Sequence, residues 1–255
     1  MRVNRITRLY KRWLVPIWDP VKTFGAIPQY SRYAGDWIRY ARSPGSEPLR
    51  LAEGYPCLSD RTAQTPFDPH YFYQAVWAMD RISTCGGRRH VDIGSDVLFV
   101  GMLSPRIPVT FIDIRPVDAR LPRLTCVEAS ILALPLRDRS VVSLSCLHVA
   151  EHIGLGRYGD PLNPFGTRIA CAELMRVLAP DANLFFSAPV GRARVCFNAH
   201  RIHTPAQIIE YFDALSLVEF SAVDDDGRFV THADPGAVAQ AAYACGLFWF
   251  RRARP

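Results

Sequence analysis

The sequence predicts an α/β fold in which a mostly parallel sheet lies between two layers of helices. From about residue 66 onward, segments with the apolar pattern of strands alternate with segments that have the period of a helix, and this succession is typical of βαβ units. Residues 141–149 are apolar or hydroxyl-bearing on both faces, as expected of a central strand covered by helices on each side. The chain has 255 residues, of which 49% are hydrophobic, so it is long enough to bury a full core.

Strand and helix signals follow one another along residues 66–255. Apolar and β-branched runs predict strands at 90–94, 109–113, 124–128, 141–149, 183–189, 217–223 and 243–250. Helical spacing predicts helices at 71–82, 166–178 and 204–215, the last of which begins with a Thr-Pro-Ala-Gln capping box. We therefore expect a Rossmann-like three-layer sandwich with a seven-stranded, mostly parallel sheet in residues 66–255.

Residues 1–65 form a separate region that carries the excess of positive charge. The formal net charge is +6, and residues 1–50 hold ten Lys or Arg against three Asp or Glu. Residues 2–18 place apolar side chains at helical spacing opposite four arginines, which predicts a basic amphipathic helix. Residues 19–65 are rich in Pro, Gly, Tyr and Arg without a clear period, so we expect an irregular, aromatic-rich arm there.

The predicted helix at 2–18 has two alternative surroundings. Its arginines and its Trp13 suit an anionic membrane surface, where each basic residue contributes about 1 kcal/mol. Alternatively, the apolar stripe packs on its own domain or on a partner subunit, as amphipathic helices commonly do. The oligomeric state does not follow from the sequence.

Composition also narrows the expected location of the chain. The first apolar segment is short and is broken by Pro16, which argues against a signal peptide. The apolar run at 237–250 is shorter than the roughly 20 residues that cross a bilayer. The seven cysteines form no CxxC pair, and this predicts free thiols in a reducing compartment. We expect a cytoplasmic protein that is either free or peripheral at the inner membrane face.

Two classes of ligand are not expected. The chain contains no nucleic-acid-binding motif, and residues 51–255 are close to neutral, so we expect no nucleic acid partner. His200 and His203 stand close together in the sequence, but neither a framing helix nor a neighbouring Cys or acid completes a ligand set, so we expect no metal.

Acids and a glycine mark the ends of the first two predicted strands. Asp92 and Gly94 end the first strand and Asp113 ends the second, twenty-one residues beyond Asp92, which is the distance at which an acid commonly binds ribose hydroxyls. Asp96 stands where a dinucleotide site needs its second glycine, and its carboxylate would repel a pyrophosphate. The turn therefore disfavours a nicotinamide or flavin dinucleotide and tolerates a ligand that carries an ammonium group.

Four ordered segments resemble the motifs of the class I S-adenosylmethionine-dependent methyltransferases. They are VDIGSD, FIDIRP, ILALPLRDRSVVSLSCLHVAEHI and AELMRVLAPDANLFFSAPVG, and together they cover about residues 88–223. Within that superfamily, AEHIGLGRYGDP and the later FNAHRIH are similar to an uncharacterised branch associated with surface-polysaccharide gene clusters. The resemblance implies methyl transfer from S-adenosylmethionine, with a sugar hydroxyl as the acceptor.

The resemblance also implies which residues bind the cofactor. Residues at the end of the first strand would contact the methionine part of the cofactor, and the acid at the end of the second strand would bind the ribose. Residues after the third strand would lie beside the adenine, and the end of the fourth strand would lie beside the sulfonium. These positions are Asp92, Gly94, Ser95, Asp113, Ser130, His148 and Glu151.

The stretch at 150–161, AEHIGLGRYGDP, follows the fourth predicted strand. A loop that leaves a central strand at a ligand crevice needs glycines for unusual backbone angles and polar groups that point inward. We expect His152, Tyr158 and Asp160 to be catalytic, with His152 or Asp160 as the base for a hydroxyl acceptor. Alternatively, His152 hydrogen-bonds the loop and Asp160 begins a turn.

Three positions depart from the methyltransferase pattern. Asp96 replaces a glycine, Ser130 stands where an acid often binds the adenine amine, and residues 180–183 (Pro-Asp-Ala-Asn) replace a Pro-Gly-Gly turn. The departures at Asp96 and Ser130 support a second hypothesis, in which the chain is a catalytically inactive relative that serves as a binding or scaffolding module at the membrane surface. A dinucleotide-dependent sugar enzyme is a third, and the glycine pattern argues against it.

Overall fold

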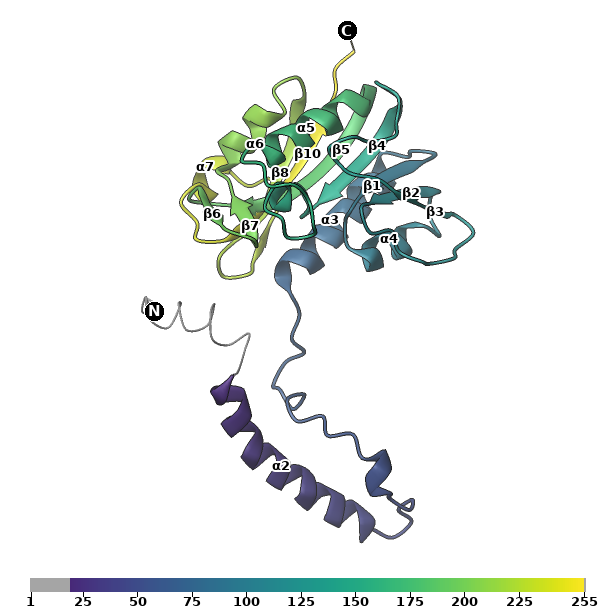
Figure 1. Cartoon of the computed structure of the whole chain (residues 1–255), viewed down its shortest axis with the longest axis vertical. Coiled ribbons are helices and arrows are strands. Elements are labelled where there is room, and N and C mark those ends of the chain that lie inside the picture. The colour runs from purple at the N-terminus through teal and green to yellow at the C-terminus, as the bar shows by residue number, and fades with distance from the viewer. Residues whose placement is uncertain (1–18, 255) are drawn as a thin grey trace. The chain divides into compact units, whose positions relative to one another are not determined.

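The computed structural model describes residues 19–254, and the chain divides into two units, residues 1–66 and 67–255. Figure 1 shows both units. The amphipathic helix that we predict at 2–18 lies outside the described residues. No helix among residues 19–254 is long and apolar enough to cross a membrane, and all seven cysteines are free thiols.

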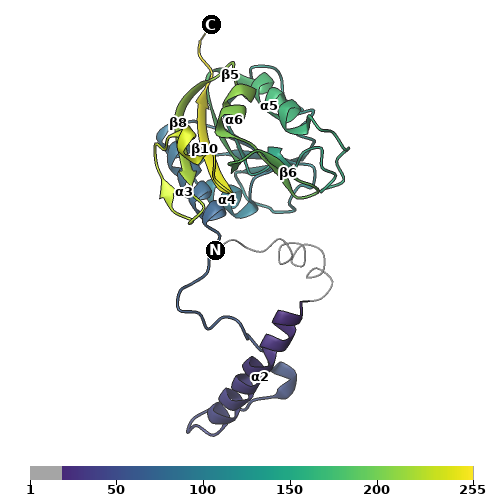
Figure 2. The same cartoon turned by 90° about the vertical axis from the view of Figure 1, so that its left-hand side faces the viewer.

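The first unit contains a long helix where we expected an irregular arm, so that expectation was wrong for its first half. Helix α2 spans Pro20–Ala41 and is followed by the short 3-10 helix η1, Leu51–Glu53 (Figure 2). Asp19 caps α2 by accepting a hydrogen bond from the backbone N–H of Lys22, and Pro20 occupies the first helical position, where its fixed φ suits a helix. None of the described side chains of α2 is buried. Its apolar side chains, which include Phe24, Ile27 and Ile38, are exposed, and we did not recognise their helical spacing among the Pro and Gly residues of this region.

The second unit is built on one sheet of eight strands, one more than predicted. Its order is β3-β2-β1-β4-β5-β10-β8-β9. The strands are β1 (His90–Ile93), β2 (Val109–Asp113), β3 (Leu124–Glu128), β4 (Val141–Leu147), β5 (Leu178–Val190), β8 (Ser216–Val223), β9 (Phe229–Val230) and β10 (Ala244–Arg251). Neighbours from β3 to β5 run parallel, and β10 is antiparallel to both β5 and β8. The eighth strand, β9, is only two residues long, too short to show a pattern in the sequence.

Two further differences concern β5 and the segment after it. Residues 180–183, expected to be a turn, lie inside β5, where Asp181 has a φ of 59° and the pairing with β4 shifts register. An interruption of this kind is a β-bulge, which bends a strand without ending it. The segment after β5 forms a two-stranded antiparallel sheet of β6 (Arg194–Cys196) and β7 (His200–Ile202), which the sequence did not predict.

Helices cover both faces of the sheet (Figure 1). Helices α3 (Pro69–Thr84) and α4 (Val97–Leu103) share one apolar core, which includes Trp77 and Leu103. Helices α5 (Gly166–Val177) and α6 (Pro205–Tyr211) share the other, which includes Leu174 and Phe212. The short helix α7 spans Pro235–Val238. This arrangement confirms the Rossmann-like sandwich with a mostly parallel sheet.

Candidate active site

The direction in which successive strands are added to the sheet reverses between β1 and β4. From β1 the chain adds β2 and β3 on one side, and it then returns to add β4 and β5 on the other. Open α/β sheets bind ligands outside the carboxyl ends of the strands at such a point. Gly94 follows β1 there with a φ of 66°, and a Cβ at this position would lie 3.1 Å from Val149 Cγ1 and 3.2 Å from Asp113 Oδ2. The residue after β1 must therefore be a glycine for both the backbone angle and the space.

A narrow crevice of about 90 Å³ opens between the tips of β1, β2 and β4 and the start of the segment after β3. It is lined by Gly94 and Asp113, by Ser130, and by the apolar side chains of Ile131 and Ile153. A second hollow of about 280 Å³ continues from it past Ser95 and Tyr71, sharing Gly94, Asp113, Arg115, His148, His152 and Tyr158. The crevice and the hollow together form one elongated cavity at the switch point.

The predicted cofactor residues divide into two groups in the structure. Asp113 Oδ1 accepts a hydrogen bond of 2.6 Å from the backbone N–H of Arg115, and Oδ2 is the oxygen that faces Gly94. Ser130 lines the crevice, and its hydroxyl accepts a hydrogen bond of 3.2 Å from the backbone N–H of Leu132. Asp113 and Ser130 therefore both line the crevice, and their roles in ribose and adenine binding stay predictions.

Asp92 and Ser95 instead connect β1 to β4. Asp92 is fully buried, accepts a hydrogen bond of 3.0 Å from the backbone N–H of Ser95, and bonds the hydroxyl of Ser145. The hydroxyl of Ser95 accepts the backbone N–H of Leu147 at 3.0 Å. Burial raises the pKa of Asp92 to about 6, against the hydrogen bonds from Ser145 and Ser95. Asp92 lines neither the crevice nor the hollow, whereas Ser95 lines the hollow.

Asp96 has a structural role that the sequence analysis missed. It is the N-cap of α4, and its Oδ1 accepts the backbone N–H groups of Leu98 and Phe99 at 2.9 and 3.4 Å. An N-cap acid satisfies donors that the helix itself leaves free. The carboxylate is thus engaged with α4 and is no obstacle to a ligand with an ammonium group.

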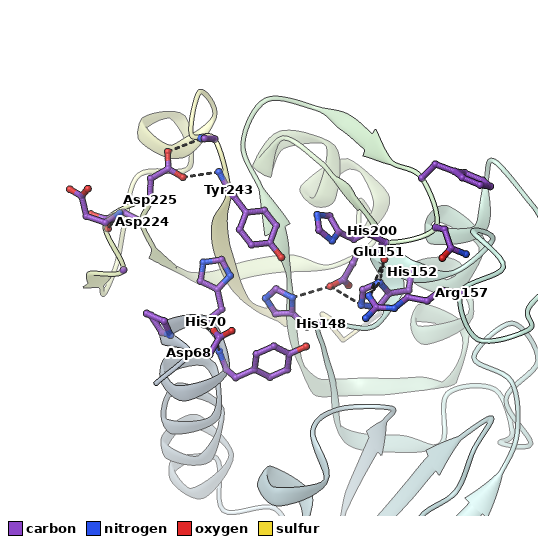
Figure 3. Close-up of a pocket in the computed structure, with 18 residues that line it drawn as sticks. Asp68, His70, His148, Glu151, His152, Arg157, His200, Asp224, Asp225 and Tyr243 are labelled. Carbon is purple, nitrogen blue, oxygen red and sulfur yellow. Dashed lines mark hydrogen bonds and ion pairs between the residues drawn. The ribbon is translucent and has the colours of Figure 1, made fainter. Parts of the chain in front are cut away.

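A much larger chamber, about 1070 Å³, lies beside this site (Figure 3). Five segments line it: the start of α3, the residues after β4, the β6–β7 turn, the β8–β9 turn and the residues before β10. Its side chains are mostly ionisable or aromatic, and include His70, Tyr71, His148, Glu151, His152, Arg157, His200 and Tyr243. The crevice, the hollow and the chamber have His148 and His152 in common. These two histidines therefore stand at the junction of the three spaces.

His148 is held between two buried side chains. It has a left-handed φ of 56°, which is strained for a residue with a Cβ, and its Nδ1 lies 2.9 Å from Glu151 Oε1 while Nε2 lies 3.2 Å from Cys245 Sγ. Burial disfavours the imidazolium, but Cys245 and Glu151 outweigh it and raise the pKa of His148 to about 10. Glu151 lines the chamber and neither the crevice nor the hollow.

The loop after β4 positions His152 through its backbone. The Nδ1 atom of His152 lies 2.5 Å from the carbonyl oxygen of Ala199, which also accepts a hydrogen bond from Arg157. Arg157 Nη1 also lies 3.3 Å from Nδ1, but its contact with the same carbonyl is shorter, at 3.1 Å. Because a carbonyl can only accept, the 2.5 Å contact assigns the proton to Nδ1 and leaves an electron pair on Nε2. Nε2 lies 3.7 Å from Glu151 Oε1.

Asp160 and Tyr158 differ in what they do within this loop. The carboxylate of Asp160 accepts the backbone N–H groups of Gly154, Tyr158 and Gly156 at 2.5, 3.3 and 3.4 Å. Burial alone would raise the pKa of Asp160, but these amides hold it below its usual value, so the geometry favours a loop-building role over that of a base. The ring of Tyr158 lines the crevice and lies under the guanidinium of Arg115, 4.2 Å from the centroid.

Several chamber residues were not predicted from the sequence. His70 and Tyr71 belong to the first turn of α3, and Tyr243 lies just before β10. Cys245, within β10, is fully buried behind the chamber wall, where its Sγ contacts His148. The rings of His70 and Tyr243 stack with centroids 5.1 Å apart. Burial and the neighbouring His148 lower the pKa of His70 to about 4. Among these residues, the sequence contains a local signal only for the start of α3, namely Asp68 followed by Pro69. That signal does not indicate which strands the start of the helix lies against.

One family model matches part of this sequence. Residues 140–229 match a family model described as Caenorhabditis protein of unknown function, DUF268, which covers less than half of the chain. No curated protein matches the sequence.

Solved structures match more than two thirds of this chain. The N-methyltransferase NodS from Bradyrhizobium japonicum WM9, in complex with S-adenosylhomocysteine, is 16% identical, and the match covers 86% of this chain and 98% of NodS with a TM-score of 0.52. A geranyl diphosphate methyltransferase in complex with geranyl diphosphate and sinefungin is 12% identical, with 71% and 77% covered and a TM-score of 0.52. The [4+2]-cyclase SpnF is 16% identical, with 72% and 81% covered and the same TM-score. The chain therefore has the Rossmann-like methyltransferase fold.

Proposed function

We propose that this chain transfers a methyl group from S-adenosylmethionine to a hydroxyl of a sugar-like acceptor. The observation that carries the proposal is the junction at His148 and His152, where an elongated site at the switch point meets a large polar chamber. Methyl transfer needs a cofactor site and an acceptor site that meet at one point, because the attacking atom, the methyl carbon and the leaving sulfur must lie in line.

The residues of the crevice fit S-adenosylmethionine. Asp113 Oδ2 is available to a ribose hydroxyl, since Oδ1 is occupied by the backbone of Arg115. The absence of a side chain at Gly94 leaves the space beside that oxygen open. Ile131 and Ile153 give the crevice the apolar walls that an adenine ring needs. When bound, the cofactor supplies an activated methyl group, and the protein has to position the acceptor and handle its proton.

His152 is the residue best placed to accept the proton of an acceptor hydroxyl. Its Nδ1 is bonded to the carbonyl of Ala199, so the free electron pair of Nε2 is available. Glu151, 3.7 Å from Nε2, would stabilise the imidazolium that forms. His148 is less suited to this role because both of its ring nitrogens are engaged.

The chamber suits a polyhydroxylated acceptor. Exposed carboxylates of the chamber such as Asp226 accept hydrogen bonds from hydroxyl groups, and the rings of Tyr71 and Tyr243 offer flat apolar faces. A place in surface-polysaccharide synthesis belongs to the same proposal and is supported by the sequence resemblance alone.

Calorimetry with S-adenosylhomocysteine tests the cofactor site. We expect the intact chain to bind it and Asp113→Asn to bind it about tenfold to a hundredfold more weakly, because a hydrogen bond to a charged group contributes about 1.5–3 kcal/mol. Asp118→Asn, which changes an exposed acid on the segment after β2, is the matched control and should bind like the wild type. An absence of heat with S-adenosylhomocysteine would favour the scaffolding module, and heat with NAD in its place would favour the dinucleotide enzyme.

Product analysis tests the transfer itself. Incubation with S-adenosylmethionine and a panel of nucleotide sugars and oligosaccharides should give an acceptor that is one methylene heavier by mass spectrometry. His152→Gln should lower kcat by a factor of about 10²–10⁴ with little change in cofactor affinity, as expected when a general base is removed. Cofactor binding without any methylated product would contradict the proposed activity.

A further inference from the structure

Two histidines of the chamber wall and a buried cysteine behind them form a cluster of side chains that can bind a metal ion. The donor atoms of His70, His148 and Cys245 all lie within 4.8 Å of one another. His148 Nε2 is 3.2 Å from Cys245 Sγ, and the rings of His70 and His148 have centroids 5.8 Å apart with an interplanar angle of 35°. The three residues come from α3, the end of β4 and β10, so they are far apart in the sequence. Figure 3 shows His70 and His148 side by side at the chamber wall.

A buried acid supports the same location. The carboxylate of Glu151 is fully buried, and neither of its oxygens has a well-oriented hydrogen bond among the described residues, although Oε1 lies 2.9 Å from His148 Nδ1. A buried carboxylate is costly unless a positive charge lies next to it, as either the imidazolium of His148 or a metal ion bound to His148 would provide. Histidines that bind metals commonly direct their second ring nitrogen to a carboxylate, which orients the ring. Glu151 has this position behind His148.

We propose that His70, His148 and Cys245 bind one zinc ion, with Glu151 orienting His148 from behind and a fourth coordination position open to the chamber. Two imidazoles and one thiolate form a ligand set that zinc accepts in tetrahedral sites, and three protein ligands with an open position are typical of catalytic zinc. The charges also balance, because the thiolate of Cys245 and the carboxylate of Glu151 together neutralise a divalent ion. The proposal departs from the sequence-based expectation of no metal, and it does not involve the His200–His203 pair.

The geometry needs only a small adjustment for tetrahedral zinc. Zn–N and Zn–S bonds of about 2.0 and 2.3 Å separate pairs of donors by about 3.5 Å, against 3.2 Å for His148 Nε2 and Cys245 Sγ and at most 4.8 Å for the widest pair of the three. His70 is half-buried in the first turn of α3, so a side-chain rotation can bring its ring nitrogen closer. His148 and Cys245 are buried and already in contact.

The open position gives the ion a role that rests on the proposed methyl transfer. Zinc lowers the pKa of a bound hydroxyl, as it does for bound water. An acceptor hydroxyl on zinc would give its proton to His152 Nε2 while its oxygen forms the bond to the methyl carbon. The carbon–sulfur bond breaks in the same step, and its electron pair returns to sulfur, which leaves a neutral thioether.

Zinc binding by the full chain is the test. After removal of metals with a chelator, titration with zinc in competition with a chromophoric chelator should show one ion per chain, and Co²⁺ in its place should give a thiolate-to-cobalt absorption band. His70→Ala should weaken zinc binding more than a hundredfold, and Glu151→Gln tenfold to a hundredfold, as expected of a residue that orients a ligand. Cys245→Ser should abolish the cobalt band.

His200→Ala is the matched control, because His200 lines the same chamber and is also half-buried, and it should leave the zinc affinity within about twofold. Circular dichroism establishes whether each variant is folded. Cys245 is fully buried, so Cys245→Ser can fail to fold. In that case His70→Ala still tests the site, because His70 is only half-buried. Less than one zinc ion per chain, or a zinc affinity unchanged by His70→Ala, would overturn the proposed site. S-adenosylhomocysteine binding to the metal-free protein is measured separately, so failure of the zinc site and failure of the methyltransferase function give different results.

Discussion

His90 shows how burial determines the charge of a single side chain. It is the first residue of β1, is 1% exposed, and its two ring nitrogens lie 2.8 Å from the hydroxyl groups of Ser143 and Ser145 on β4. Burial lowers its pKa to about 3, since neither hydroxyl compensates a positive charge. The native protein therefore holds a neutral imidazole at this position, while the unfolded chain takes up a proton near pH 6.5.

This difference in pKa predicts that His90 reduces stability in acid. Below about pH 6.5 only the unfolded state binds the proton, so the contribution of His90 falls by about 1.4 kcal/mol per pH unit until about pH 3. The raised pKa of Asp92 acts in the opposite direction in this range, and the lowered pKa values of His70 and His203 act in the same direction, so the measurement must isolate His90. His90→Gln should gain about 2 kcal/mol relative to the wild type between pH 7 and pH 5 in urea titrations. An equal difference in unfolding free energy at both pH values would contradict the assignment.

Gly94 gives a second prediction at this scale. In Gly94→Ala the new methyl group would lie 3.2 Å from Asp113 Oδ2, at a φ of 66°. We expect the free energy of unfolding to fall by about 1–3 kcal/mol from backbone strain, and the affinity for S-adenosylhomocysteine to fall at least tenfold. Gly101→Ala is the control, because Gly101 lies in α4 with nothing within 4 Å of its Cβ position. That variant should bind normally and gain up to about 1 kcal/mol of stability.

Among the elements, α3 deserves a test because it carries His70 and Tyr71 to the chamber. It is fastened to β8 by Glu219, which accepts hydrogen bonds from Trp77 Nε1 and from Nε and Nη2 of Arg81, at 2.9, 3.2 and 2.9 Å. Glu219 is 6% exposed, so its removal would leave the Trp77 N–H and the Nε and Nη2 donors of Arg81 without an acceptor.

Glu219→Ala should therefore lower the free energy of unfolding by about 3–5 kcal/mol. The second acid that pairs with Arg81 is Asp80, whose side chain is 68% exposed. Asp80→Ala should change stability by less than about 0.5 kcal/mol, because exposed ion pairs contribute little. Equal effects of the two substitutions in urea titrations would show that Glu219 does not hold α3 in place.

The basic segment at 2–18 is the element we propose for membrane contact. Its arginines and apolar residues suit a surface of anionic lipids. We expect the full chain to sediment with phosphatidylserine vesicles at low salt and not with phosphatidylcholine vesicles. A chain that lacks residues 1–18 should lose this binding, and unchanged sedimentation of the shortened chain would contradict the proposal.

The sequence predicted elements well where their apolar pattern matched a buried face. Helices 71–82 and 166–178 correspond to α3 and α5, and the strand at 124–128 to β3. It failed where local chemistry or exposure determined the structure. Helix α4 is only seven residues long and begins at the Asp96 cap, and α2 has no buried described side chain. The predicted helix at 204–215 ends at Tyr211 in the structure.

At the scale of the whole molecule, the topology of the sheet explains which site residues could be predicted from the sequence. Gly94, Asp113, His148 and His152 follow parallel strands, whose carboxyl ends meet at one edge of the sheet. His70 and Cys245 come from a helix start and an antiparallel strand, and no spacing rule relates those residues to the end of β4. The site thus depends on tertiary contacts between residues that are far apart in the sequence, such as His148 and Cys245, which are 97 residues apart.

The central proposal for the whole molecule is that the tips of β1, β2 and β4 together bind an adenosyl cofactor. A crystal structure of the full chain with S-adenosylhomocysteine measures this most directly. We predict the adenosine in the crevice between those tips, with a ribose hydroxyl on Asp113 Oδ2 and the sulfur beside His148 and His152, facing the chamber. The ligand bound elsewhere on the chain, or no ligand bound at saturating concentration, would contradict the claim.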